Sequence, residues 1–152
     1  MTDKATNQDW LDQVSEEALE PDLPIIDPHH HLWDFKVGRV NPRYFLDEIL
    51  EDTNAGHNIV STVFIECHAM FREDGPEELK PLGETEFVNG IASMSASGLY
   101  GKTRVAAGII GTADLELGEP VRDVLDQHIA LGGGRFKGIR VGATWDPHSE
   151  VG

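Results

Sequence analysis

Hydrophobic residues along this chain fall into short runs that alternate between two kinds of periodicity. The β-branched apolar run at residues 57–67 is typical of a strand buried on both faces, and further strands are predicted at residues 24–27, 103–111 and 136–144. Apolar residues at three- and four-residue spacings predict amphipathic helices, and they occur at residues 42–50, 84–98 and 119–131. Each predicted helix is followed by a glycine-bearing segment, which is a common helix end.

Strands that alternate with helices at this spacing favour right-handed βαβ units around a parallel sheet. Four strand-first units are half of a (β/α)8 TIM barrel, which typically needs about 250 residues. An open doubly wound sheet is the competing fold, but the first strand is not followed by a glycine-rich phosphate turn. We therefore expect an α/β fold that forms the first half of a TIM barrel and stops after the fourth strand.

Residues 1–22 differ from the rest of the chain because they carry seven acidic side chains against one lysine, Lys4. Trp10, Leu11, Val14 and Ala18 follow helical spacing, so part of this segment is expected to form a short helix that docks on the body. A frayed, solvated extension is the alternative. The predicted organisation is an acidic extension over residues 1–22 and one partial barrel over residues 23–152.

Composition and charge narrow the classes of partner. The chain has 152 residues, 39% of them hydrophobic and 26% charged, as in a globular domain. Its 27 acidic and 12 basic side chains give a net charge of −15, which repels phosphate backbones and anionic lipid, so we expect no nucleic-acid or membrane partner. Cys67 is the only cysteine, which excludes an internal disulfide, and no secretory signal or spanning segment is evident. The expected compartment is the cytoplasm.

The candidate chemistry is concentrated where the first predicted strand ends. Residues two apart in a strand point to one face, so His29 and His31 are expected to project together while His30 points away. Two imidazoles on one face can bind one divalent ion; alternatively they are hydrogen-bonded residues of a strand end. Asp27 shares their face and would either orient an imidazole as a carboxylate behind the ligands or cap the turn.

A family resemblance rests on this segment. Ile25-Ile-Asp-Pro-His-His-His-Leu-Trp-Asp34 resembles the opening strand of the amidohydrolase-related (amidohydrolase 2) family of metal-dependent hydrolases, which includes lactonases and related decarboxylases. Later segments fall in the order expected of that family's first four barrel strands, namely the runs at residues 56–67, 104–111 and 135–140 and the helix start at residues 83–88. The resemblance implies a (β/α)8 barrel with its site at the C-terminal strand ends, and a divalent ion, zinc, bound by His29 and His31.

The resemblance also implies ligands that this chain does not match. The family's histidines from the fifth and sixth strands, and the aspartate from the eighth that serves as general base, have no counterpart here. His128 falls in a predicted helix and His148 in the terminal tail, so neither takes their place by register. We therefore expect weak metal binding and no catalysis by the chain alone.

Other residues at the same predicted rim are candidates for substrate binding. Glu66 and His68 end the second strand and would touch substrate. Arg140 would hold a substrate carboxylate or form an ion pair within this acidic chain. Trp33 would wall a pocket beside the metal or anchor its loop in the core. Cys67, beside a branched apolar run, is expected to be an inert buried thiol.

The segment 68–83 is longer than a usual βα loop and is expected to be a lid, a substrate loop or a solvated surface loop. The predicted function is hydrolysis of a small carboxylated lactone, ester or amide by a metal-activated water, with decarboxylation as a close relative. The alternative is a non-catalytic half-barrel that self-associates as a homo-oligomer or pairs with a complementary half.

Overall fold

The computed structural model describes residues 13–14, 16–34, 43–145, 147–148 and 150. The strands of the main sheet are β1 (Pro24–His30), β4 (Asn58–Ile65), β5 (Arg104–Gly111) and β6 (Phe136–Ile139). The helices are α2 (Leu46–Thr53), α3 (Leu82–Ala96) and α4 (Val121–Leu131). The shorter elements are β2 (Trp33–Asp34), β3 (Arg43–Tyr44) and two 3-10 turns, η1 (Glu77–Leu79) and η2 (Leu115–Leu117).

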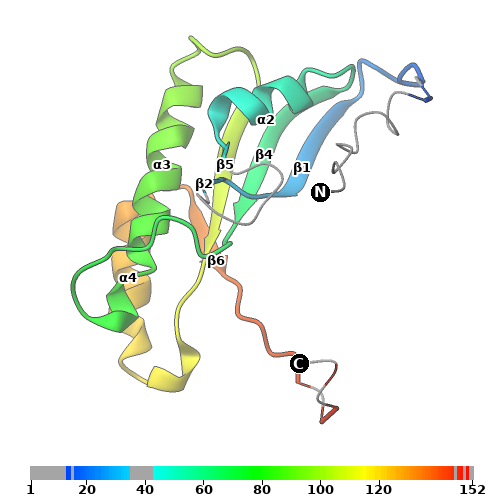
Figure 1. Ribbon diagram of the computed structural model, residues 1–152. Coiled ribbons are helices and arrows are strands. Elements are labelled where there is room, and N and C mark those ends of the chain that lie inside the picture. The colour runs from blue at the N-terminus through cyan, green and yellow to red at the C-terminus, as the bar shows by residue number, and fades with distance from the viewer. Residues whose placement is uncertain (1–12, 15, 35–42, 146, 149, 151–152) are drawn as a thin grey trace, which may run out of the picture.

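The main sheet is parallel, and its strands lie in the order β1-β4-β5-β6, which is their order along the chain. The helices connect these strands along the chain: α3 packs on β5, and α4 packs on α3 and β6 (Figure 1). The predicted α/β class with a parallel sheet is therefore confirmed. No helix in the described part of the chain is long and apolar enough to cross a bilayer.

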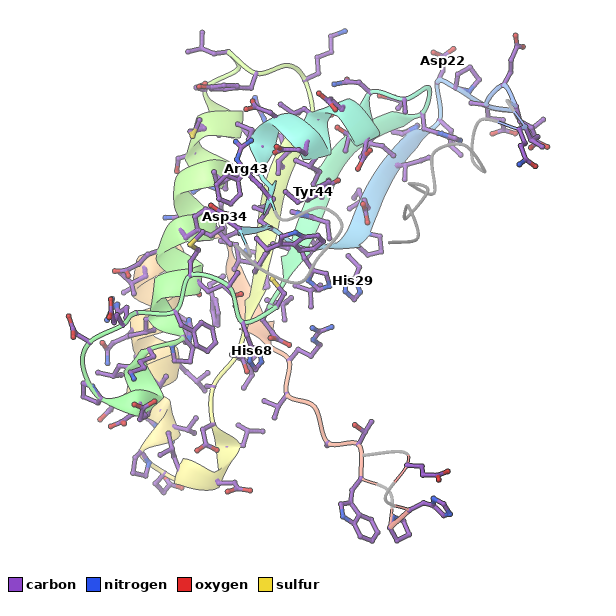
Figure 2. The ribbon with its side chains drawn as sticks, viewed as in Figure 1. Asp22, His29, Asp34, Arg43, Tyr44 and His68 are labelled. Carbon is purple, nitrogen blue, oxygen red and sulfur yellow. The ribbon has the colours of Figure 1, made fainter. Side chains whose placement is uncertain are left out.

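The start of α2 differs from the sequence prediction. The helix begins at Leu46, and Tyr44, which was expected to be helical, belongs to β3 and pairs with Trp33 of β2 in an antiparallel ribbon. Figure 2 shows Arg43 and Tyr44 on the segment that leads into α2. The Phe45 N–H donates to Glu48 Oε2 at 2.8 Å and so caps the helix one residue after the ribbon. Packing of Tyr44 on Trp33 thus overrides the helical spacing.

Most of the other helix and strand boundaries lie close to the predicted ones. β6 is the main exception, because it ends at Ile139 and residues 140–145 have no regular structure. Residues 16–22 do not form the expected docked helix: residues 19–22 make a bend and a turn, and Val14 is exposed. Trp10 and Leu11, on which that expectation also depended, lie outside the described residues.

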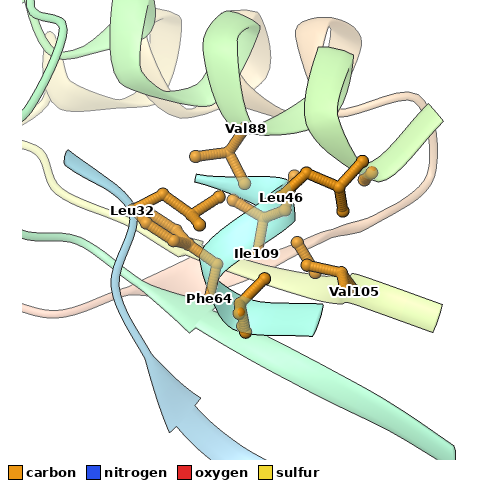
Figure 3. Packing of buried hydrophobic residues seen from close by; sticks show 9 residues of the cluster. Leu32, Leu46, Phe64, Val88, Val105 and Ile109 are labelled. Carbon is orange, nitrogen blue, oxygen red and sulfur yellow. The ribbon is translucent and has the colours of Figure 1, made fainter. Parts of the chain in front are cut away.

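The hydrophobic core lies between the sheet and the helices. It joins the sheet to α2, α3 and the loop after β1 (Figure 3), through Leu32, Leu46, Ile49, Phe64, Val88, Ala92, Val105, Ala106 and Ile109. Leu32 is fully buried, and burying a leucine stabilises a fold by about 1.5–3 kcal/mol. Because Leu32 directly follows the histidines, this anchor fixes the end of β1, where the candidate site lies.

Candidate functional site

Two imidazoles meet at the end of β1. His29 Nε2 lies 3.2 Å from His31 Nε2, with the ring planes nearly perpendicular. Between them, His30 turns into the core and packs against Phe64 at a ring-centroid distance of 5.9 Å. The alternation predicted for the strand therefore brings His29 and His31 together on one side.

The spacing of this pair suits a metal ion. Two nitrogens bound to one tetrahedral zinc at 2.0–2.1 Å lie about 3.3 Å apart. The Nε2 atoms of His29 and His31 are 3.2 Å apart, so they fit two corners of such a site. The two residues could therefore hold a divalent ion, although two ligands do not complete its coordination.

A main-chain carbonyl orients the second imidazole. His31 Nδ1 lies 2.8 Å from the carbonyl oxygen of Ile65 in β4. A carbonyl only accepts, so this contact places the proton on Nδ1 and leaves the lone pair of Nε2 directed at His29. Metal-binding histidines are commonly held in this way by a carbonyl on their other nitrogen.

Asp27 contacts the backbone of the histidine segment. Its Oδ1 accepts a hydrogen bond of 2.9 Å from the backbone N–H of His29. This is the turn-capping geometry that aspartate often adopts, and it is the second of the two roles that the sequence left open. The carboxylate stabilises the backbone from which the imidazoles project.

The described chain does not supply the rest of a metal site. No group of three or more His, Cys, Asp or Glu side chains in this part of the chain is placed to hold an ion. His128 lies in α4, fully buried, with Nδ1 2.8 Å from Thr85 Oγ1 and Nε2 3.0 Å from the Thr112 carbonyl. Both of its ring nitrogens are thus engaged in the interior, so its role is structural.

An aromatic wall stands beside the histidine pair. Trp33 stacks on Tyr44 with a centroid distance of 5.5 Å, and its ring lies 6.3 Å from that of His31. The Tyr44 hydroxyl donates a hydrogen bond to Asp52 of α2. The pKa of Tyr44 is raised, mainly by burial and also by this hydrogen bond. These residues line a hollow of about 380 Å³ together with His29. Trp33 therefore lies in a pocket wall.

A second cluster lies at the ends of β4 and β6. Arg140 Nε donates to Glu66 Oε1 at 2.8 Å, and Arg140 Nη2 donates to the Glu66 carbonyl at 2.7 Å. His68 Nε2 lies 3.2 Å from Glu66 Oε2, but outside hydrogen-bond geometry, so this buried oxygen has no hydrogen-bond partner among the described residues. Arg140 thus forms the ion pair that was one of the two roles predicted for it.

The second cluster borders an open groove of about 780 Å³. Glu66, His68, Phe71, Asp114 and Arg140 contribute to its lining. His29 and His68 lie toward the same end of the sheet (Figure 2). The end of β4 joins the two clusters, since the Ile65 carbonyl holds His31 and the next carbonyl holds Arg140.

Comparison with known proteins gives one similar sequence. The uncharacterized protein y4mH of Sinorhizobium fredii is 28% identical over 137 residues, which cover 78% of this chain and 40% of that protein. That protein has no assigned function. The chain spans about two fifths of the length of the curated relative it matches. No family model and no solved structure matches the chain.

Two further residues of this region were not singled out from the sequence. Tyr44 was assigned to a helix, and Glu84 was counted only as part of a helix start, although it is 1% exposed and contacts the loop after β4. Cys67 donates to the Leu32 carbonyl at 3.5 Å, and burial, with the nearby Glu84, raises the pKa of its thiol to about 12. Cys67 is therefore a neutral packing residue at physiological pH.

Proposed function

We propose that this chain carries part of the site of a metal-dependent hydrolase of the amidohydrolase-related type. The observation that carries the proposal is the approach of His29 Nε2 and His31 Nε2 to 3.2 Å, with His31 Nδ1 held by a carbonyl. A divalent ion at this pair, zinc in the first instance, would polarise a carbonyl group and lower the pKa of water. The chain's own residues orient the imidazoles and form the adjoining walls.

The strand order supports a half-barrel. In a doubly wound sheet the strand order reverses at a switch point, and ligands bind there. The described strands β1, β4, β5 and β6 instead follow chain order, and α2 and α3 share one core on one face of the sheet. We infer that this is the first half of a (β/α)8 barrel, with His29, His31, Glu66 and His68 at the C-terminal strand ends, where such barrels carry their sites.

The second cluster supports a small carboxylated lactone, ester or amide as the substrate. A guanidinium has five N–H donors, more than the two that Glu66 accepts from Arg140, and the Arg140 side chain is 44% exposed beside the groove. It can therefore bind a substrate carboxylate while it stays paired with Glu66. The Trp33 ring offers a flat apolar surface beside the histidines. Decarboxylation is a related reaction that the same residues would support, because it also develops negative charge on an oxygen.

Zinc affinity tests the proposal directly. Calorimetric titration of the purified chain with zinc is compared with a His29→Ala/His31→Ala variant, and with His57→Ala, which removes an exposed histidine away from the pair. We expect zinc binding that the double substitution abolishes and the His57 substitution preserves. Equal zinc binding by the wild type and the double variant would contradict the proposal, as would no binding by either.

Exposed apolar residues on the sheet favour a second candidate function, a non-catalytic half-barrel that self-associates or pairs with a complementary half. Ile26 is 61% exposed on β1, which pairs only with β4 among the described strands, and Val60 on β4 is 37% exposed. Unpaired strand edges with apolar side chains favour association with another chain. Light scattering on the wild type and on Ile26→Lys tests this candidate. A wild-type dimer that the substitution dissociates supports it. A wild type that stays monomeric when the protein is concentrated contradicts self-association.

A further inference from the structure

The loop between β4 and α3 is held by one buried carboxylate. Glu84 lies in the first turn of α3 and is 1% exposed. Its Oε1 accepts hydrogen bonds from the backbone N–H of Cys67 at 3.1 Å and from that of Ala69 at 2.8 Å. These two amides stand on either side of His68, so Glu84 fixes the backbone from which the His68 side chain projects.

The backbone held in this way has an unfavourable conformation. His68 has a φ of 62° and Met70 has a φ of 55°, both in the left-handed region that side chains with a Cβ rarely adopt. Such conformations persist where the surrounding structure fixes them, and they concentrate at functional sites. The two hydrogen bonds to Glu84 supply that constraint at His68.

Two further contacts hold the same loop on α3. A Cβ at Gly83 would lie 2.5 Å from the Met70 carbonyl oxygen and 2.8 Å from the Arg72 nitrogen, so the loop backbone packs directly on the start of the helix. Arg72 donates to both carboxylate oxygens of Glu86, at 3.0 and 2.7 Å. The loop from Cys67 to Arg72 is therefore tied to α3 at successive points.

The side chains that this loop presents line the groove of the second cluster. The His68 ring stacks on Phe71 at a centroid distance of 5.3 Å and an interplanar angle of 21°. His68 Nε2 is also 3.2 Å from Glu66 Oε2. One imidazole and one aromatic ring thus form a continuous wall beside the Glu66–Arg140 pair.

We propose that Glu84 is a positioning residue, whose buried carboxylate fixes His68 and Phe71 as a preformed wall of the groove. This wall would select the shape of a substrate bound by Arg140, and the loop would act as a fixed surface rather than as a lid. The inference rests on the proposed function for the identity of the ligand. The positions of His68 and Phe71 can be measured without metal or substrate, so a failure of this inference can be told apart from a failure of the proposed function.

Nuclear magnetic resonance of the full chain gives the test. In the wild type we expect Overhauser contacts between the His68 and Phe71 rings, and amides of Cys67 and Ala69 that are protected from exchange. Glu84→Ala should abolish the ring contact and reduce the protection of both amides about tenfold or more, since each loses its acceptor. Glu84→Gln should preserve both signals, because one side-chain oxygen accepts both bonds in the wild type.

Glu86→Ala is the matched control, because Glu86 lies on the same helix and holds the same loop through an exposed ion pair. It should leave the His68–Phe71 contact unchanged. If folded Glu84→Ala kept the His68–Phe71 ring contact and the protection of the Cys67 and Ala69 amides, the proposal would be overturned. If Glu84→Ala does not fold, Glu84→Asp takes its place, because the shorter aspartate side chain cannot reach both amides. Wild-type ring contact and amide protection in Glu84→Asp would also overturn the proposal. A wild type without the ring contact or the amide protection would overturn it regardless of any variant.

Discussion

Arg140 binds Glu66 twice, through the carboxylate at 2.8 Å and through the main-chain carbonyl at 2.7 Å. The preceding carbonyl, that of Ile65, accepts from His31. Adjoining peptide groups at the end of β4 therefore orient both candidate clusters. A change in the path of β4 at this point would alter the imidazole pair and the arginine together, so the two clusters are best regarded as one site with two parts.

The Glu66–Arg140 pair gives the first prediction. The Glu66 side chain is 8% exposed, so Arg140→Ala leaves a buried carboxylate without its cation and should lower the free energy of unfolding by about 1–3 kcal/mol. Adding Glu66→Gln should restore part of this loss, because the buried charge is removed. Urea denaturation measures both changes.

Arg43→Ala provides the comparison for that experiment. Arg43 pairs with Glu48 at 2.5 Å, but the Glu48 side chain is 30% exposed whereas that of Glu66 is 8% exposed, and exposed ion pairs contribute about 0–1 kcal/mol. A loss in Arg140→Ala no larger than the loss in Arg43→Ala would show that the buried pair does not stabilise the strand ends.

The second prediction concerns the protonated nitrogen of His31. Because Nδ1 donates to the Ile65 carbonyl, neutral His31 should be the Nδ1–H tautomer, with Nε2 unprotonated and able to bind a metal. Long-range proton–nitrogen correlation spectra distinguish the two tautomers, and His31→Gln identifies the signals. An Nε2–H tautomer would remove the geometric basis of the metal proposal.

The sequence predicted the local parts of this site and missed the parts made by distant contacts. The convergence of His29 and His31 follows from the period of two in a strand, so the spacing alone predicts it. The partner of Arg140 is 74 positions away, and an arginine in an acidic chain could pair with many carboxylates. Only the parallel register of the sheet brings Glu66 to it.

The wrong assignment of Tyr44 has a related cause. Tyr44, Phe45, Ile49 and Leu50 have helical spacing, and helix propensity is a weak preference that packing can override. Stacking on Trp33 holds Tyr44 in β3, and no pattern within residues 42–50 reports that contact. The burial of Glu84 is likewise a tertiary fact, because a glutamate in a first helical turn is ordinarily exposed.

The aromatic stack supplies the third prediction. Tyr44→Ala removes the ring that faces Trp33 and should lower the free energy of unfolding by about 3 kcal/mol. Tyr44→Phe keeps the stack and loses only the hydrogen bond to Asp52, so it should lose about 1 kcal/mol. Chemical denaturation compares the two. Equal losses would mean that the hydroxyl contact, and not the stack, holds the wall beside His31.

The last prediction concerns pH and His128. Burial is the largest cause that lowers the pKa of His128 below its ordinary value of 6.5. As the pH falls below about 6.5, the unfolded chain takes up a proton at this residue while the native state resists it, so stability should fall with decreasing pH. At higher pH the residue is neutral in both states and contributes no pH dependence.

Replacing His128 with glutamine should reduce the decline in stability below pH 6.5, because the titrating ring is gone. His57→Gln is the matched control, since His57 is exposed and should leave the decline unchanged. Thermal unfolding at a series of pH values between about 7 and 5 measures all three proteins across the range in which an unfolded histidine titrates. If His128→Gln follows the wild-type pH profile, another buried histidine such as His30, whose pKa burial lowers to about 4, must cause the decline, and the Thr85–His128–Thr112 contacts would have no part in it.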